Sequence, residues 1–125
     1  MATMSEALIN LPEVEIDPKG VFKYILVKVY DATSDHGEPS KLVVRGFADC
    51  PYHADIYERF SEGVAKLKLD TEVLGGGRIN HDSEHKKIKV YGYSQGYGKA
   101  DHTVAANILK KKYSDYTFQC SDEGY

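Results

Sequence analysis

The sequence is poor in cysteine, has no excess of positive charge and lacks a long hydrophobic run, and each absence excludes a class of protein. Its two cysteines, Cys50 and Cys120, form neither a disulfide framework nor a zinc-like spacing with histidine, so we expect reduced thiols. The net charge is -3 at pH 7 with both signs mixed along the chain, which disfavours nucleic acid as a partner. The longest apolar run near the N-terminus covers only residues 24–27. We therefore expect no signal peptide, no membrane span and a cytoplasmic location.

A chain of 125 residues has the size of one compact domain, with no room for a second core. Hydrophobic periodicity predicts strands over residues 21–30, 41–46, 71–74, 78–80, 86–93 and 115–120, and helices over 51–69 and after an N-cap at Asp101. Both faces of the first strand are apolar, as is typical of a central strand. We predict one α/β domain over residues 1–125, a mixed sheet of about six strands with a helix on each face. Residues 1–13 are expected to form a flexible arm, and the chain a monomer.

His53 falls in the first turn of the earlier helix, which Pro51 introduces. The first amides of a helix have no partner within it and, together with the helix dipole, favour an anion such as phosphate. The same positive end holds an imidazole neutral, which is the form that a general base or a nucleophile needs. From spacing alone, a surface histidine without a task is the more frequent case.

Lys23, Arg45 and Arg78 each interrupt or border a predicted strand. A phosphoryl group needs cations to hold its oxygens and to stabilise charge during transfer. If these three side chains meet at one end of the sheet, they supply that charge. Exposed charges at strand ends are the alternative.

A glycine-containing loop over residues 92–100 leaves a strand and approaches a helix, which is the placement of a phosphate-cradling loop. Glycines let backbone amides approach an anion and Ser94 adds a hydroxyl, although an ordinary tight turn explains the pattern equally well. Ala100 stands where a nucleotide P-loop has its magnesium-binding hydroxyl residue, so that motif is excluded. The run Gly75–Gly77 favours a hairpin turn or a bulge that places Arg78 beside a site.

Neither a metal site nor a familiar phosphatase signature is predicted. His81 and His85 have acidic neighbours, but they lie in a predicted polar turn with no helical face to align ligands, so no metal and no cofactor are expected. Neither cysteine is followed six positions later by arginine, and there is no D-x-D run and no Arg-His-Gly triplet. A phosphatase with this sequence would belong to a less common type.

Five ordered blocks of the sequence are specific enough to indicate a family: Gly20–Tyr24, Val44–Gly46, Tyr52–Tyr57, Leu74–Ile79 and Val90–Ser94. Together they resemble the phosphohistidine phosphatases of the Janus and Ocnus family, and the likeness runs from Val14 to Tyr125. The resemblance implies a hydrolase of P–N bonds in proteins, chiefly in phosphohistidine and also in phospholysine, that works without a metal or cofactor. Phosphohistidine-containing proteins are then its substrates.

The resemblance also implies roles for individual residues. His53 matches the proton acceptor that activates water. The implied phosphate-binding residues are Lys23, Ala54, Arg78, Ser94, Gln95 and Gly96, with Arg45 and Tyr52 as supporting residues. Gln95, Gly96 and Lys99 depart from the side chains expected in vertebrate relatives, and we expect this to alter loop rigidity and substrate preference. Two alternatives stay open: His53 acts as a nucleophile that carries the phosphoryl group, or the protein is a non-catalytic module that binds phosphoproteins.

Overall fold

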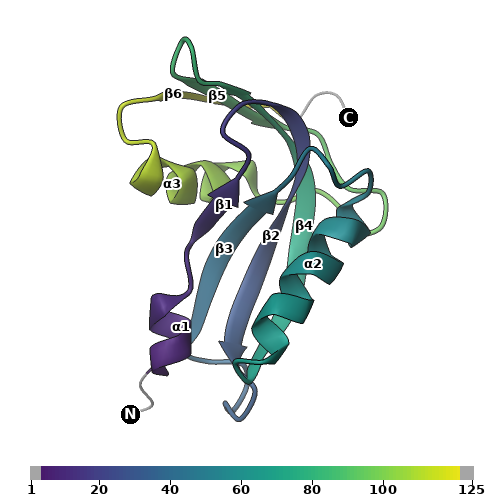
Figure 1. The fold of residues 1–125 in the computed structure, drawn as a ribbon, viewed down its shortest axis with the longest axis vertical. Helices are drawn as coiled ribbons and strands as arrows, with labels where there is room; N and C mark the ends of the chain where they lie inside the picture. The colour runs from purple at the N-terminus through teal and green to yellow at the C-terminus, as the bar shows by residue number, and fades with distance from the viewer. Residues whose placement is uncertain (1–3, 122–125) are drawn as a thin grey trace.

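A computed structural model describes residues 4–121 of the chain. In this part of the chain, six strands form one mixed sheet in the order β1-β3-β2-β4-β5-β6. The strands are β1 (Val14–Ile16), β2 (Gly20–Asp31), β3 (Ser40–Gly46), β4 (Leu69–Asp82), β5 (Lys87–Tyr91) and β6 (Thr117–Cys120). The helices are α1 (Glu6–Asn10), α2 (His53–Ala65) and α3 (His102–Lys112). Helices α2 and α3 lie on opposite faces of the sheet (Figure 1), so the predicted single α/β domain with a six-stranded sheet and a helix on each face is confirmed.

The central strand β2 separates two hydrophobic cores. Ile25, Val27 and Val29 pack on the α2 side, whereas Phe22, Tyr24 and Leu26 pack on the α3 side. Fully burying one such side chain stabilises the fold by about 1.5–3 kcal/mol. The two-sided apolar pattern of β2 thus explains why helices cover both faces of the sheet.

Strand β4 is continuous through the glycine run, and the two short strands predicted at 71–74 and 78–80 are wrong as separate elements. Residues 75–77 form a bulged part of one strand: the register with β2 shifts at this point, so that Leu26 pairs with Gly75 and Val27 with Val73. Of the hairpin turn and the bulge considered for these glycines, the bulge is correct. The run stays extended because β2 pairs with β4 along its whole length.

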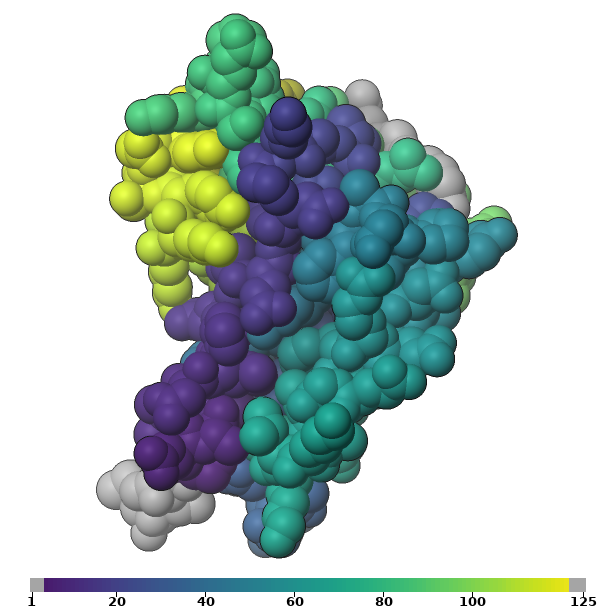
Figure 2. All heavy atoms as spheres, in the orientation of Figure 1, coloured from purple at the N-terminus to yellow at the C-terminus, as the bar shows by residue number. Residues whose placement is uncertain are grey.

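The segment before β2 forms regular structure in its described part, where the sequence predicts a flexible arm over residues 1–13. Helix α1 buries Leu8 completely, and the Lys41 ammonium group donates hydrogen bonds to three carbonyl oxygens around the end of this helix. Strand β1 then pairs in parallel with β3. Figure 2 shows this purple segment packed along the surface beside the teal residues of α2. Residues 1–3 lie outside the described part.

Candidate active site

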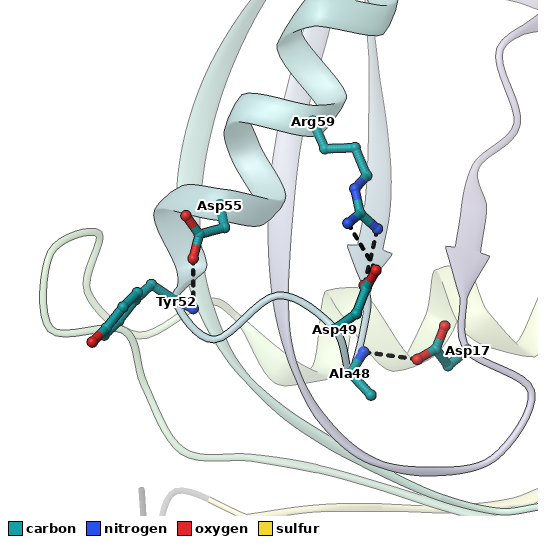
Figure 3. A network of polar contacts seen from close by, with 6 residues as sticks. All are labelled: Asp17, Ala48, Asp49, Tyr52, Asp55 and Arg59. Carbon is teal, nitrogen blue, oxygen red and sulfur yellow. Dashed lines mark hydrogen bonds and ion pairs between the residues drawn. The ribbon is translucent and has the colours of Figure 1, made fainter.

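The site is built around the N-terminus of α2, and a fixed segment leads into that helix. The Asp17 carboxylate accepts a hydrogen bond from the Ala48 amide at 2.7 Å, and Asp49 pairs with Arg59 of α2 through two bonds of 3.0 Å. These contacts are drawn in Figure 3. They hold the chain between β3 and α2 in one place.

Tyr52 is the N-cap of α2, with extended backbone angles (φ -128°, ψ 153°). The Asp55 carboxylate accepts a hydrogen bond from the Tyr52 amide at 3.0 Å, and its negative charge lies in the first turn, where the helix dipole favours it. In Figure 3 the Tyr52 ring points away from the helix. The helix therefore starts at His53, close to the position that Pro51 predicts.

The imidazole of His53 is only 7% exposed, and its orientation is fixed by the backbone of β4. Nε2 lies 2.9 Å from the carbonyl oxygen of Gly77. Because a carbonyl oxygen can only accept, Nε2 carries the hydrogen and donates it. The lone pair of the neutral ring is then on Nδ1, which is the atom able to accept a proton.

The environment of His53 favours this neutral form. Burial lowers the pKa of His53, and the positive charges of Lys23 and Arg78 lower it further, while the hydrogen bond to Gly77 acts in the opposite direction. The imidazole is therefore a neutral base at physiological pH.

The His53 ring packs directly against β4 where the strand has no side chains. A Cβ atom at Gly76 would lie 2.7 Å from Cδ2 of His53 and 2.8 Å from the carbonyl oxygen of Tyr24. Real Cβ atoms do not approach so closely. The bare backbone of the glycine run is thus what allows α2 to bring His53 onto the sheet.

A cavity of about 300 Å³ opens beside His53 and gathers most of the residues predicted for the site. It is lined by Lys23, Tyr52, His53, Ala54, Ser94, Gln95, Gly96 and Tyr97. Arg78 does not line it, but the residue lies directly across from Lys23 in the β2–β4 register. The structure therefore brings together side chains from β2, the start of α2 and the loop after β5.

Lys23 connects two walls of this cavity. Its ammonium group donates a hydrogen bond of 2.6 Å to the carbonyl oxygen of Pro51 and lies 5.2 Å from the centre of the Tyr52 ring. Lys23, on a mostly apolar strand, therefore has a local role: it joins β2 to the segment that precedes α2.

The loop after β5 closes on itself as a short turn. Ser94 and Gly98 exchange two backbone hydrogen bonds of 3.1 and 2.9 Å, and the Ser94 hydroxyl oxygen accepts from the Tyr97 amide at 3.1 Å. Ser94 is 2% exposed, whereas Gln95 and Gly96 are exposed at the tip of the turn. Ser94 thus organises the turn, and the tip faces the cavity.

A family model described as Janus/Ocnus family (Ocnus) matches residues 8–117. The chain belongs to the Janus/Ocnus family. It is 56% identical over 120 residues to the sex-regulated protein janus-A of Drosophila melanogaster, covering 96% of this chain and 86% of that protein. It is 49% identical over 121 residues to the 14 kDa phosphohistidine phosphatase of Sus scrofa, covering 94% of this chain and 95% of that protein.

In this Janus/Ocnus chain, Arg45 does not join the cavity beside His53. It is 2% exposed and donates hydrogen bonds to the carbonyl oxygens of Val44 and Pro12. Its guanidinium group lies 5.0 Å from the centre of the Phe60 ring. Arg45 therefore connects the N-terminal segment to β3 and α2. It lies away from the candidate site, in which the sequence predicts a supporting role for it.

Two contributors to the candidate site escape the sequence pattern. Gly77 supplies the carbonyl oxygen that orients His53, and Tyr97 lines the cavity with its ring edge-on to that of Tyr57. The glycine run is visible in the sequence, but a backbone acceptor has no side-chain signature. This acceptor can be recognised only from the way β4 packs against the start of α2.

The four remaining histidines of the described segment have other neighbours, and His36 is exposed with Nε2 3.5 Å from the Asp35 carboxylate. Nδ1 of His81 lies 2.9 Å from the Asp17 carbonyl oxygen, and His85 bonds Asp82 at the surface. His102 lies 2.5 Å from the Tyr24 hydroxyl and 2.8 Å from the Gly92 carbonyl oxygen. Within residues 4–121, no group of three or more His, Cys, Asp or Glu side chains is placed to hold a metal ion.

Proposed function

We propose that this protein is a phosphatase that hydrolyses the P–N bond of phosphohistidine in proteins, and also of phospholysine, with His53 as the proton acceptor for the attacking water. The observation that carries the proposal is the hydrogen bond from Nε2 of His53 to the Gly77 carbonyl oxygen, which leaves Nδ1 as the base of a residue that lines the same cavity as Lys23. Likeness to the pig phosphohistidine phosphatase supports the same chemistry.

The phosphoryl group would occupy the cavity with its oxygens toward the start of α2 and the turn after Ser94. The amide of Ala54 belongs to the first turn of α2, where backbone donors and the helix dipole favour an anion. Gln95 and Gly96 present the tip of the turn, and the charges of Lys23 and Arg78 offset those of the phosphoryl oxygens. Phosphoproteins are then bound by their modified side chain.

In the proposed reaction, water attacks phosphorus and transfers a proton to Nδ1 of His53. A P–O bond forms and the P–N bond breaks, and the leaving imidazole, which has taken a proton from solvent on its other ring nitrogen, departs as a neutral molecule. A positioned general base contributes about 10²- to 10⁴-fold to such a step. Neither proton transfer requires a metal ion or an organic cofactor in this scheme.

The test follows phosphate release from a phosphohistidine peptide in the presence of excess chelator. We expect His53→Ala to lose about 10²- to 10⁴-fold in kcat, because the base is removed. His85→Ala is the matched control, since that histidine lies in the exposed turn between β4 and β5. A wild-type protein that releases no phosphate would overturn the enzymatic proposal in favour of a phosphoprotein-binding module, and full activity of His53→Ala would overturn the role of this residue.

A single-turnover experiment with the same wild-type protein distinguishes a general-base mechanism from a nucleophilic one. In the general-base mechanism, no labelled phosphate stays on the protein during a single turnover quenched without acid. Label trapped on His53 would instead show a covalent phosphohistidine intermediate, and the proposed role of Nδ1 as a proton acceptor from water would then be wrong.

A further inference from the structure

Within residues 4–121, the part of the sheet formed by β5 and β6 has no helix packed over it on the side that carries His53. Helix α2 packs on β2, β3 and β4, whereas the helix contacts of β5 and β6 are made with α3 on the opposite face. In Figure 1, β5 and β6 accordingly lie beside α3 and away from α2. In the described part of the chain, β5, β6 and the adjoining end of β4 therefore present a surface without a covering helix, next to the candidate active site.

Strand register identifies the side chains on this surface. Ile79, Ile88 and Val90 are buried in the core beneath α3, so the alternating positions point the other way. We call this surface the open sheet face, and its central residues are Arg78, Asn80, Lys87, Lys89, Tyr91 and Gln119. A depression of about 310 Å³ on it is lined in part by Asn80, Lys89 and Gln119.

The charge of the open sheet face differs from that of the whole molecule. The chain has 16 basic and 19 acidic residues. Lys87, Lys89 and Arg78 nevertheless project from this face beside Lys23, and Asp82 is the one acidic side chain at its strand positions within the described residues. Among the described residues, the strand positions of this surface therefore carry more basic than acidic side chains, on a molecule with a net negative charge, and such a field attracts anionic partners.

The open sheet face is continuous with the cavity beside His53. Lys23 lines the cavity, is paired across the strands with Arg78, and Arg78 is paired in turn with Tyr91. The ammonium group of Lys89 lies 5.1 Å from the centre of the Tyr91 ring, so its charge lies beside the residue that pairs with Arg78. A polypeptide whose modified side chain enters the cavity would place its flanking residues on this face.

We infer that the open sheet face is a docking surface for an acidic segment of the phosphoprotein substrate, next to the phosphorylated residue. This inference rests on the proposed function, because the substrate must first place its phosphoryl group beside His53. The lysines pair with the acidic side chains of the segment, and the amides of Asn80 and Gln119 offer hydrogen bonds to its backbone. Substrate choice then depends on charge outside the cavity.

The test compares two peptides that carry a hydrolysis-resistant phosphonate analogue of phosphohistidine, one with glutamates and one with lysines as neighbours. Their affinities are measured by fluorescence anisotropy for the wild type, for Lys87→Gln/Lys89→Gln, and for the control Lys110→Gln/Lys112→Gln, whose lysines lie on α3. We expect the acidic peptide to bind the wild type about 5- to 20-fold more tightly, since each exposed ion pair contributes about two- to five-fold. The first double variant should lose most of this preference, and the control should keep it.

Phosphate release from free phosphohistidine, which is too small to reach the lysines, reports on the proposed function separately. If the protein releases phosphate but binds the two peptides with equal affinity, the docking inference alone is overturned. The same holds if the protein releases phosphate and both double variants lose the preference for the acidic peptide equally. A preserved acidic preference without phosphate release supports the docking surface and overturns catalysis. A short RNA that binds the wild type more tightly than the acidic peptide, and loses affinity in Lys87→Gln/Lys89→Gln, would assign the face to nucleic acid instead.

Discussion

At the scale of single residues, the proposed base differs from the other described histidines in what surrounds it. Its Nε2 is used by the Gly77 carbonyl oxygen, and two cations rather than a carboxylate influence its ring. His85, in contrast, is exposed and lies 2.9 Å from the Asp82 carboxylate. Burial and the two nearby cations thus favour the neutral form of His53.

The pH dependence of activity follows from the lowered pKa of His53. Protonation removes the base, so kcat/KM should fall on the acid side with an apparent pKa below the ordinary value of about 6.5. Lys23→Gln and Arg78→Gln each remove a positive charge that lowers this pKa, so the acid limb should move to higher pH in both variants. The measurement is a pH profile of kcat/KM, with Lys110→Gln as the control. An acid limb that stays in place or moves to lower pH in Lys23→Gln would contradict the assignment.

At the scale of secondary-structure elements, the sequence predicts those whose signals are local. Asp101 is the N-cap of α3, as predicted, and accepts hydrogen bonds from the amides of Thr103 and Val104. Helix α1 escapes prediction because five residues are too few for a periodic pattern. The glycine run reads as a break in the chain, yet pairing with β2 keeps β4 extended across it.

Gly76→Ala tests the close approach of α2 to β4. The added methyl group would meet Cδ2 of His53 and the Tyr24 carbonyl oxygen, so we expect a loss of about 1–3 kcal/mol in the free energy of unfolding and a displaced His53 with reduced kcat. Gly63→Ala in α2 is the control, because nothing lies within 4 Å of its Cβ position; it should stabilise the fold by about 0.5–1 kcal/mol. Urea unfolding and kinetics measure both effects, and a Gly76→Ala protein as stable and active as the wild type would contradict the packing.

Removing either of two capping carboxylates distinguishes an effect on stability from an effect on activity. Asp55→Ala and Asp101→Ala each remove a capping carboxylate, and each should cost about 1 kcal/mol in the free energy of unfolding. Only Asp55 holds the start of α2, where His53 lies, so only Asp55→Ala should also lower kcat. Thermal unfolding and steady-state kinetics on both variants provide the comparison. Equal kcat values in the two variants would mean that the cap does not position His53.

At the scale of the whole molecule, the site depends on pairings that no local pattern reveals. Lys23 and Arg78 meet only because β2 pairs with β4, and the order of strands cannot be derived from periodicity. Arg45 shows the reverse case, since it borders a strand just as Lys23 does but faces Phe60 and the N-terminal segment. Residue types therefore identify candidates, and the fold decides which of them meet.

The N-terminal segment should behave as part of the domain rather than as an arm. Leu8 is completely buried, so Leu8→Ala should lower the free energy of unfolding by about 2–5 kcal/mol. Ile9→Ala is the matched control, because Ile9 is 58% exposed and its truncation should change stability by less than about 0.5 kcal/mol. Urea denaturation gives both values. Similar stabilities of the two variants would instead support the flexible arm that the sequence predicts.

The hydrogen bond between His53 and Gly77 has a consequence for how this protein tolerates genetic change. In many enzymes the partner that orients a catalytic histidine is a carboxylate side chain, which a single codon change removes. Here the acceptor belongs to the main chain, and every amino acid provides the same carbonyl oxygen. Position 77 still requires glycine, because a Cβ atom there would clash with the Tyr91 carbonyl oxygen, so the orientation of the proposed base depends on the packing of β4 and is lost when that strand is displaced.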